Sequence, residues 1–172
     1  MTFNNYTQKS LEAVQSAQNI AVQHSNQQLE QIHLLVALLQ QDGGLTPQLL
    51  RKMGITTESL EAAAKAEVQK LPAVTGSREA DRFYISSAMD ATFRTAEQQA
   101  QRMKDEYISV EHLLLALIEA AEGSVKSLFE TYRILCRACK AASLVILYIS
   151  NRLFTLPSAA SIKASSRGST ER

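Results

Sequence analysis

The sequence HLLVALL at His33–Leu39 returns 79 positions later as HLLLALI at His112–Ile118. Each stretch is apolar on nearly all sides, which is typical of a helix buried at the centre of a domain. The same ungapped register extends from Thr7/Ser86 to Ile55/Ile134 and contains ten identities in 49 pairs. The identities fall mostly at apolar and turn positions, where burial and backbone conformation restrict residue type. The sequence therefore predicts two stacked copies of one helical unit.

Capping and breaking residues divide the first copy into four expected helices. The expected starts are a Thr N-cap, the apolar run itself, a Thr-Pro pair and a second Thr N-cap: Thr7, about Ile32, Thr46-Pro47 and Thr57. Gly43-Gly44 is expected to end the buried helix, and Gly54 the short helix after it.

The second copy repeats this pattern and then departs from it. Ser86 takes the place of Thr7 as an expected N-cap, and its helix is expected to run to about Met103. Ser109 is expected to cap the buried helix, with Glu111 at its positive end. After Ile134 the expected fourth helix is missing or replaced.

Residues 135–172 differ in composition from the rest of the chain. They hold six Lys/Arg and one Asp/Glu, whereas residues 1–134 hold twelve and sixteen. Both cysteines, Cys136 and Cys139, and a Ser-rich end lie here, and their CxxC spacing has no second pair to complete a zinc site. The apolar run Ala141–Ile149 is about half the length of a membrane span. Its part SLVILYI, residues 143–149, has the composition of an aggregation-prone segment. We expect an atypical basic tail that is not part of the repeat fold and does not enter a membrane.

Several stretches together carry a family resemblance: YTQKSLEAVQSAQNIA from Tyr6, LLRKMGI, KLPAVTGSREADRFYIS, MKDEYISVEHLLLALIE and the two HLL blocks. With these, the chain resembles the N-terminal domain of Clp ATPases, most closely that of the ClpB-type disaggregase chaperones. The resemblance covers residues 1–134. It implies an all-α domain of two pseudo-twofold-related four-helix repeats, with copies at about 7–71 and 86–134. It also implies a module that recruits unfolded or aggregated polypeptides, and sometimes adaptor proteins, for a hexameric ATPase ring.

The chain lacks the phosphate-binding sequence of that motor. No G-x-x-x-x-G-K-[ST] occurs among its six glycines. We expect no ATPase or other enzyme activity, no cofactor and a monomer, because the family assembles its ring mainly through the ATPase domains. The family pattern would continue past Ile134 towards those domains. The different continuation here suggests an out-of-frame or fused sequence, a hypothesis that an in-frame coding sequence with a normal stop would contradict.

Four polar or amphipathic residues are the candidate client-binding positions. Thr7, Asp105 and Glu111 match polar surface positions that the resemblance associates with client handling, and Tyr107 lies on the same expected groove. Helix capping and dipole complementation explain the first three residue types equally well. Tyr107 also suits a half-buried position in the scaffold.

Other chemistry is not expected. His33 and His112 stand at equivalent helix starts, where a metal would need Glu30 or Glu111 as a further ligand, so we predict packing and hydrogen bonding rather than metal binding. No nucleophile elbow is present. The tail has few aromatics and no recognised nucleic-acid motif, so only nonspecific attraction is expected there. The amino terminus carries no secretory signal, which predicts a cytoplasmic protein.

The expected function is weak binding of extended, hydrophobic segments of unfolded proteins as the recruiting domain of a ClpB-type disaggregase. An adaptor-docking or regulatory module, as in the protease-linked ClpC and ClpA branch, is the alternative. Nucleic-acid binding through the tail is a third reading. It predicts an affinity that falls steeply with salt and disappears when the chain is cut after Ile134.

Overall fold

The computed structural model describes residues 4–41, 43–73 and 84–134, which form seven helices and two short strands. The helices are α1 (Gln8–Gln23), α2 (Gln31–Gln40), α3 (Leu45–Lys52), α4 (Thr57–Gln69), α5 (Ser87–Met103), α6 (Val110–Glu119) and α7 (Gly123–Thr131). The strands are β1 (Gln28–Leu29) and β2 (Tyr84–Ile85). The all-α fold class is confirmed. The tail, both cysteines and most of the loop between the copies lie outside the described residues.

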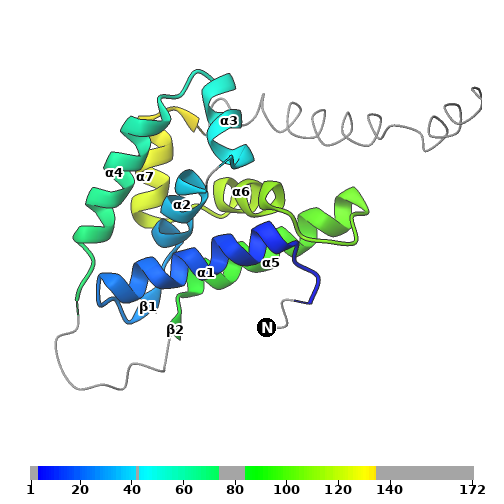
Figure 1. Cartoon of the computed structure of the whole chain (residues 1–172), viewed down its shortest axis with the longest axis horizontal. Coiled ribbons are helices and arrows are strands. Elements are labelled where there is room, and N and C mark those ends of the chain that lie inside the picture. The colour runs from blue at the N-terminus through cyan, green and yellow to red at the C-terminus, as the bar shows by residue number, and fades with distance from the viewer. Residues whose placement is uncertain (1–3, 42, 74–83, 135–172) are drawn as a thin grey trace, which may run out of the picture.

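The two HLL stretches form the centre of the molecule. Helices α2 and α6 contact each other, and α1 packs on α2 as α5 packs on α6 (Figure 1). Helix α4 covers another side of α2, while α3 and α7 each contact a helix of the other copy, α6 and α2 respectively. Leu34, Leu38, Leu113 and Leu117 are each 0% exposed, because neighbouring helices surround both central helices.

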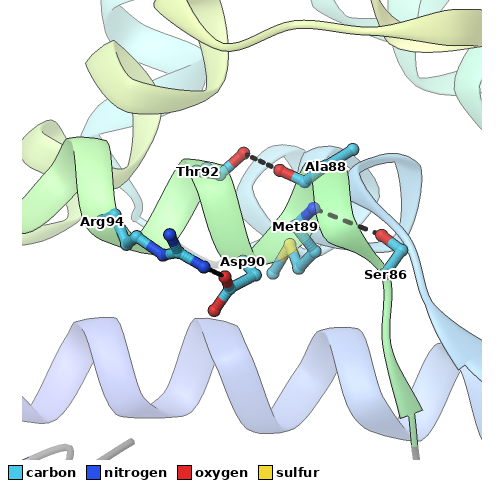
Figure 2. A network of polar contacts seen from close by, with 6 residues as sticks. All are labelled: Ser86, Ala88, Met89, Asp90, Thr92 and Arg94. Carbon is cyan, nitrogen blue, oxygen red and sulfur yellow. Dashed lines mark hydrogen bonds and ion pairs between the residues drawn. The ribbon is translucent and has the colours of Figure 1, made fainter.

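The capping predictions hold at both long helices. Thr7 precedes α1 and its side chain accepts a hydrogen bond from the Ser10 amide at 3.3 Å. Ser86 precedes α5 and accepts from the Met89 amide at 3.2 Å (Figure 2). Helix α5 ends at Met103 as expected, where Lys104 adopts a left-handed conformation with φ of 59°.

Two expected caps were wrong by one or two residues. Helix α3 begins at Leu45 after Gly44, so Thr46 is its second residue and is buried, not the N-cap. Pro47 is the third residue of α3 and is tolerated there, because the amides in the first turn of a helix have no acceptors within the helix. In α4 the extended N-cap residue is Thr56, and Thr57 is the first helical residue.

The two copies are joined by backbone pairing that crosses between them. Strand β1 of the first copy pairs in parallel with β2, which leads into α5, with Leu29 opposite Ile85. At the equivalent place, Tyr6 before α1 forms a parallel bridge with Ile108 of the second copy. Residues 6 and 85, and residues 29 and 108, are each 79 positions apart. The pseudo-twofold relation expected from the repeat is therefore present in the backbone hydrogen bonds.

A buried glutamine adds a second connection between the copies. The Gln31 side chain, 3% exposed, donates to Thr92 Oγ1 at 2.9 Å and to the carbonyl oxygens of Ala88 and Ala120 at 3.1 and 2.6 Å. Its oxygen accepts from the Glu122 amide at 2.9 Å. Thr92 and Ala88, its partners on α5, lie on the side of that helix away from the Asp90–Arg94 ion pair (Figure 2). One side chain thus links the start of α2 to α5, α6 and α7.

The second copy has three helices within the described residues, and the position of its fourth falls on residues that are not described. None of the helices in the described ranges combines the length and apolar character needed to cross a bilayer.

Candidate binding surface

Asp105 and Tyr107 lie in the turn between α5 and α6, and Glu111 is the second residue of α6. This turn is held against the start of α1. The Thr7 amide donates to the Ile108 carbonyl at 3.0 Å, and the Ile108 amide donates to the Asn5 carbonyl. The Ser10 hydroxyl donates to the same Ile108 carbonyl at 2.8 Å. These bonds fix Ile108 from both sides. Thr7 and Tyr107, 100 positions apart in sequence, are therefore brought to the same junction between the two copies, one on each side of these bonds.

The start of α6 is organised by His112. Its Nδ1 atom accepts a hydrogen bond from the Ser109 amide at 3.0 Å, so Ser109 and His112 cap the helix together. The imidazole Nε2 lies 3.2 Å from Asp105 Oδ2, although the ring N–H is not aligned for a hydrogen bond. Burial lowers the pKa of His112, while the carboxylates of Asp105 and Glu111 oppose that shift. The neutral imidazole is favoured because Nδ1 is already used as an acceptor.

The first copy repeats this arrangement with a neutral partner. His33 Nδ1 accepts from the Glu30 amide at 3.0 Å, and His33 Nε2 lies 3.1 Å from Asn26 Oδ1. Burial, with a contribution from nearby His24, lowers the pKa of His33 to about 4. Both imidazoles therefore act as internal capping groups, as predicted. Within the part of the chain that the structure describes, no three His, Cys, Asp or Glu side chains are grouped so that they could hold a metal ion.

The four candidate residues differ in how far they reach solvent. Tyr107 is 56% exposed, whereas Thr7 is half-buried at the cap of α1. The Asp105 side chain is 30% exposed, and Glu111 is only 9% exposed. The part of this surface most open to a partner is thus the Tyr107 ring, with the Asp105 carboxylate near it in sequence and Glu111 largely covered.

A hollow that sequence reasoning missed lies at the equivalent turn of the first copy. It has a volume of about 250 Å³ and is lined by Asn26, Gln27, Gln28, Glu30, Leu71 and Pro72. Tyr84 and Ile85 of β2, which pairs with Gln28 and Leu29, are 56% and 41% exposed. Residues 26–28 are the counterparts of 105–107. The repeat alignment could have indicated this place, but the walls from Leu71 and Pro72 come from another segment.

Comparison with known proteins identifies the domain. The family described as "Clp repeat (R) N-terminal domain" matches residues 5–132. The chaperone protein ClpB of Bacillus cereus is 40% identical over 130 residues, and that of Porphyromonas gingivalis is 40% identical over 118 residues. These matches cover 75% and 69% of this chain and 15% and 13% of the two relatives, so the chain spans only a small part of their length.

Solved structures agree on the fold. The Hsp104 N-terminal domain of Candida albicans superposes with a TM-score of 0.66 at 23% identity, covering 75% of this chain and 82% of that chain. The N-terminal domain of ClpD from Arabidopsis thaliana gives 0.60 at 20% identity, covering 90% and 97%. Because the family match spans most of the sequence and includes both repeats, the chain belongs to the Clp repeat N-terminal domain family.

Proposed function

We propose that this domain recruits client polypeptides for a ClpB-type disaggregase, by weakly binding extended, apolar segments of unfolded proteins without catalysing a reaction. The observation that carries the proposal is the exposed Tyr107 ring, which lies on a turn held by backbone hydrogen bonds to the start of α1. The sequence similarity to ClpB chaperones over the same residues supports the class of protein.

The chemistry of the turn suits partners of varied sequence. An exposed aromatic ring offers an apolar face and a polar edge, so it can pack against many side chains without one specific geometry. Asp105 adds a partly exposed carboxylate two residues before the ring. The turn that carries Tyr107 is already held by backbone hydrogen bonds through Ile108, so client binding costs little loop entropy. In this proposal Thr7 and Glu111 support the turn, while Tyr107 and Asp105 contact the client.

The test is a fluorescence-anisotropy titration of the full chain against a labelled, reduced and carboxymethylated polypeptide that cannot fold. Tyr107→Ala is the test variant. Tyr84→Ala is its matched control, because Tyr84 is also 56% exposed but lies on β2 in the other turn region. We expect saturable binding that weakens at least about fivefold in Tyr107→Ala and changes less than about twofold in Tyr84→Ala.

Equal losses in the two variants would contradict a site centred on Tyr107 and indicate general adhesion to exposed aromatics. No binding at the highest soluble concentration would contradict the client-recruiting function. The adaptor-docking alternative would then be favoured, and a stoichiometric complex with one folded partner would be its signature.

A further inference from the structure

The hollow at the first-copy turn has a wall that is ordered before anything binds in it. Asn26, which is 7% exposed, donates from Nδ2 to the Pro72 carbonyl oxygen at 3.2 Å. Its Oδ1 atom lies 3.1 Å from His33 Nε2 of α2. One side chain thus ties the turn to the segment that follows α4 and to a central helix. An ordered wall lowers the entropy cost of seating a ligand.

Another side of the hollow is held by the paired strands. The Tyr84 amide donates to the Gln27 carbonyl oxygen at 3.3 Å, and Gln28 pairs with Tyr84. The Glu30 amide donates to His33 Nδ1 at 3.0 Å, which fixes the backbone where α2 begins. This stretch of backbone is therefore ordered, while the Gln27 and Gln28 side chains are exposed and offer amide groups to a ligand.

Glu30 gives the hollow its charge. Among the lining residues that the structure describes, it alone is ionisable, and the others are three amides and the apolar Leu71 and Pro72. Glu30 is half-buried, and none of the ion pairs within the described ranges involves it. It stands at the N-cap position of α2, but a carboxylate has about four acceptor sites, so helix capping leaves some of them for a ligand. The hollow therefore places a carboxylate beside an apolar wall.

We propose that this hollow is a second binding site, separate from the Tyr107 turn, and that it takes one basic side chain, of lysine or arginine, from an extended polypeptide segment. Charge complementarity selects this occupant, because an ammonium or guanidinium group donates charge-assisted hydrogen bonds to the Glu30 carboxylate. The aliphatic stem of either side chain packs on Leu71 and Pro72. The volume of about 250 Å³ is below the roughly 300–1,000 Å³ of cavities that hold drug-sized ligands, so the hollow suits a single side chain.

Other occupants fit the same walls less well. Glu30 would repel a phosphate or carboxylate group, and an apolar side chain would cover the Glu30 carboxylate without giving it a partner. The second copy does not repeat the site, because Ser109 stands at the position of Glu30 and Tyr107 at that of Gln28. The first turn thus offers a carboxylate in a hollow, whereas the second offers an exposed aromatic ring. The inference does not depend on client binding through Tyr107.

An NMR titration of the full chain with short peptides tests the inference. The peptides are Gly-Ser-X-Ser-Gly with blocked ends, where X is arginine, lysine or citrulline, the neutral isostere of arginine. Their other side chains are small and polar, so they offer little to an exposed aromatic ring. We expect saturable shifts of the Gln28 and Glu30 amide signals with the arginine and lysine peptides, and at least about fivefold weaker binding of the citrulline peptide. Equal affinities for the arginine and citrulline peptides, or no shifts at these amides, would overturn the inference.

Two substitutions locate the site, each with a matched control. Glu30→Gln should weaken binding of the arginine peptide at least about fivefold, whereas Glu106→Gln, which removes an exposed carboxylate in the equivalent turn, should change it less than about twofold. Gln28→Lys places a competing cation at the hollow and should also weaken binding, whereas Gln15→Lys, at an exposed position of α1, should not. Gln28→Lys keeps Glu30 in place, so it tests the site independently of any effect of Glu30→Gln on the start of α2. Equal losses in each variant and its control would indicate general attraction between charges and overturn the site.

Tyr107→Ala separates this inference from the proposed function. It should leave the affinity for the arginine peptide unchanged within about twofold, because the two sites share no residue. Loss of peptide binding in Tyr107→Ala would place the peptide at the second-copy turn and overturn the hollow as its site. A chain that binds the arginine peptide at the hollow but does not bind the unfolded polypeptide would support this site and contradict the proposed function.

Discussion

His112 places its Nε2 atom 3.2 Å from a carboxylate oxygen of Asp105, across the turn that carries Tyr107. The counterpart of this pair is His33 and Asn26, in which the carboxylate is replaced by a neutral amide at nearly the same distance. The turn geometry is therefore compatible with either a carboxylate or an amide side chain seven positions before the buried histidine. What Asp105 adds to the second copy is negative charge at the candidate surface.

This relationship makes Asp105→Asn a sharper variant than Asp105→Ala. Asparagine reproduces the first-copy pair, so we expect the free energy of unfolding to change by less than about 1 kcal/mol at neutral pH. Removing the carboxylate takes away an influence that raises the His112 pKa, so that pKa should fall further, as an NMR titration of the imidazole would show. If client affinity depends on charge it should fall in Asp105→Asn, and an unchanged affinity would remove Asp105 from the binding role.

Acid should destabilise the domain through His33. The pKa of His33 is lowered from 6.5 to about 4 in the folded state, so the unfolded chain binds the extra proton first as pH falls. The stability contribution is therefore complete above about pH 6.5 and lost progressively towards pH 4, by about 3 kcal/mol at most. Urea unfolding at several pH values measures how the unfolding free energy depends on pH. His33→Gln should remove most of this pH dependence, whereas His24→Gln should largely retain it. An unfolding free energy of the wild-type chain that does not change between pH 6.5 and pH 4 would contradict the prediction.

Gln31→Leu should weaken the junction between the copies. It leaves the Ala120 carbonyl and the Glu122 amide without the glutamine that bonds them in the native chain. We expect a loss of about 2–4 kcal/mol in unfolding free energy, because groups that lose a buried partner bear their desolvation cost. Gln40→Leu is the control on the same helix, since Gln40 is exposed and makes a single side-chain bond to Glu61. Equal losses in the two variants would show that Gln31 has no special role.

Variants of the two side-chain helix caps distinguish a loss of stability from a loss of client affinity. Thr7→Ala and Ser86→Ala each remove a side-chain acceptor at the start of a long helix, so each should cost about 1 kcal/mol in thermal or urea unfolding. Only Thr7 adjoins the Tyr107 turn. If Thr7 acts solely as a cap, the affinity of folded Thr7→Ala for client should match that of Ser86→Ala. A selective loss of affinity in Thr7→Ala would assign Thr7 to the binding surface.

Much of the fold and part of the candidate site could be predicted from the sequence. The repeat alignment located α2 and α6, and local capping residues located the starts of α1, α5 and α6. Thr46 failed as a predicted cap because Thr-Pro and the preceding glycine offer competing start signals, and the helix begins at Leu45. The hollow at Asn26 was missed because Leu71 and Pro72 reach it from the end of α4.

The sequence by itself determined the features that depend on neighbouring residues: two apolar central helices, their serine and threonine caps, and the family to which they belong. Periodicity and capping act over a few residues, so they can be read along the chain. Only the tertiary structure decided that each copy pairs its entry segment with the turn of the other, that Gln31 bonds across the copies, and that the end of α4 supplies a wall of the hollow beside Asn26. These features depend on distant segments meeting, and local sequence rules do not specify which segments meet.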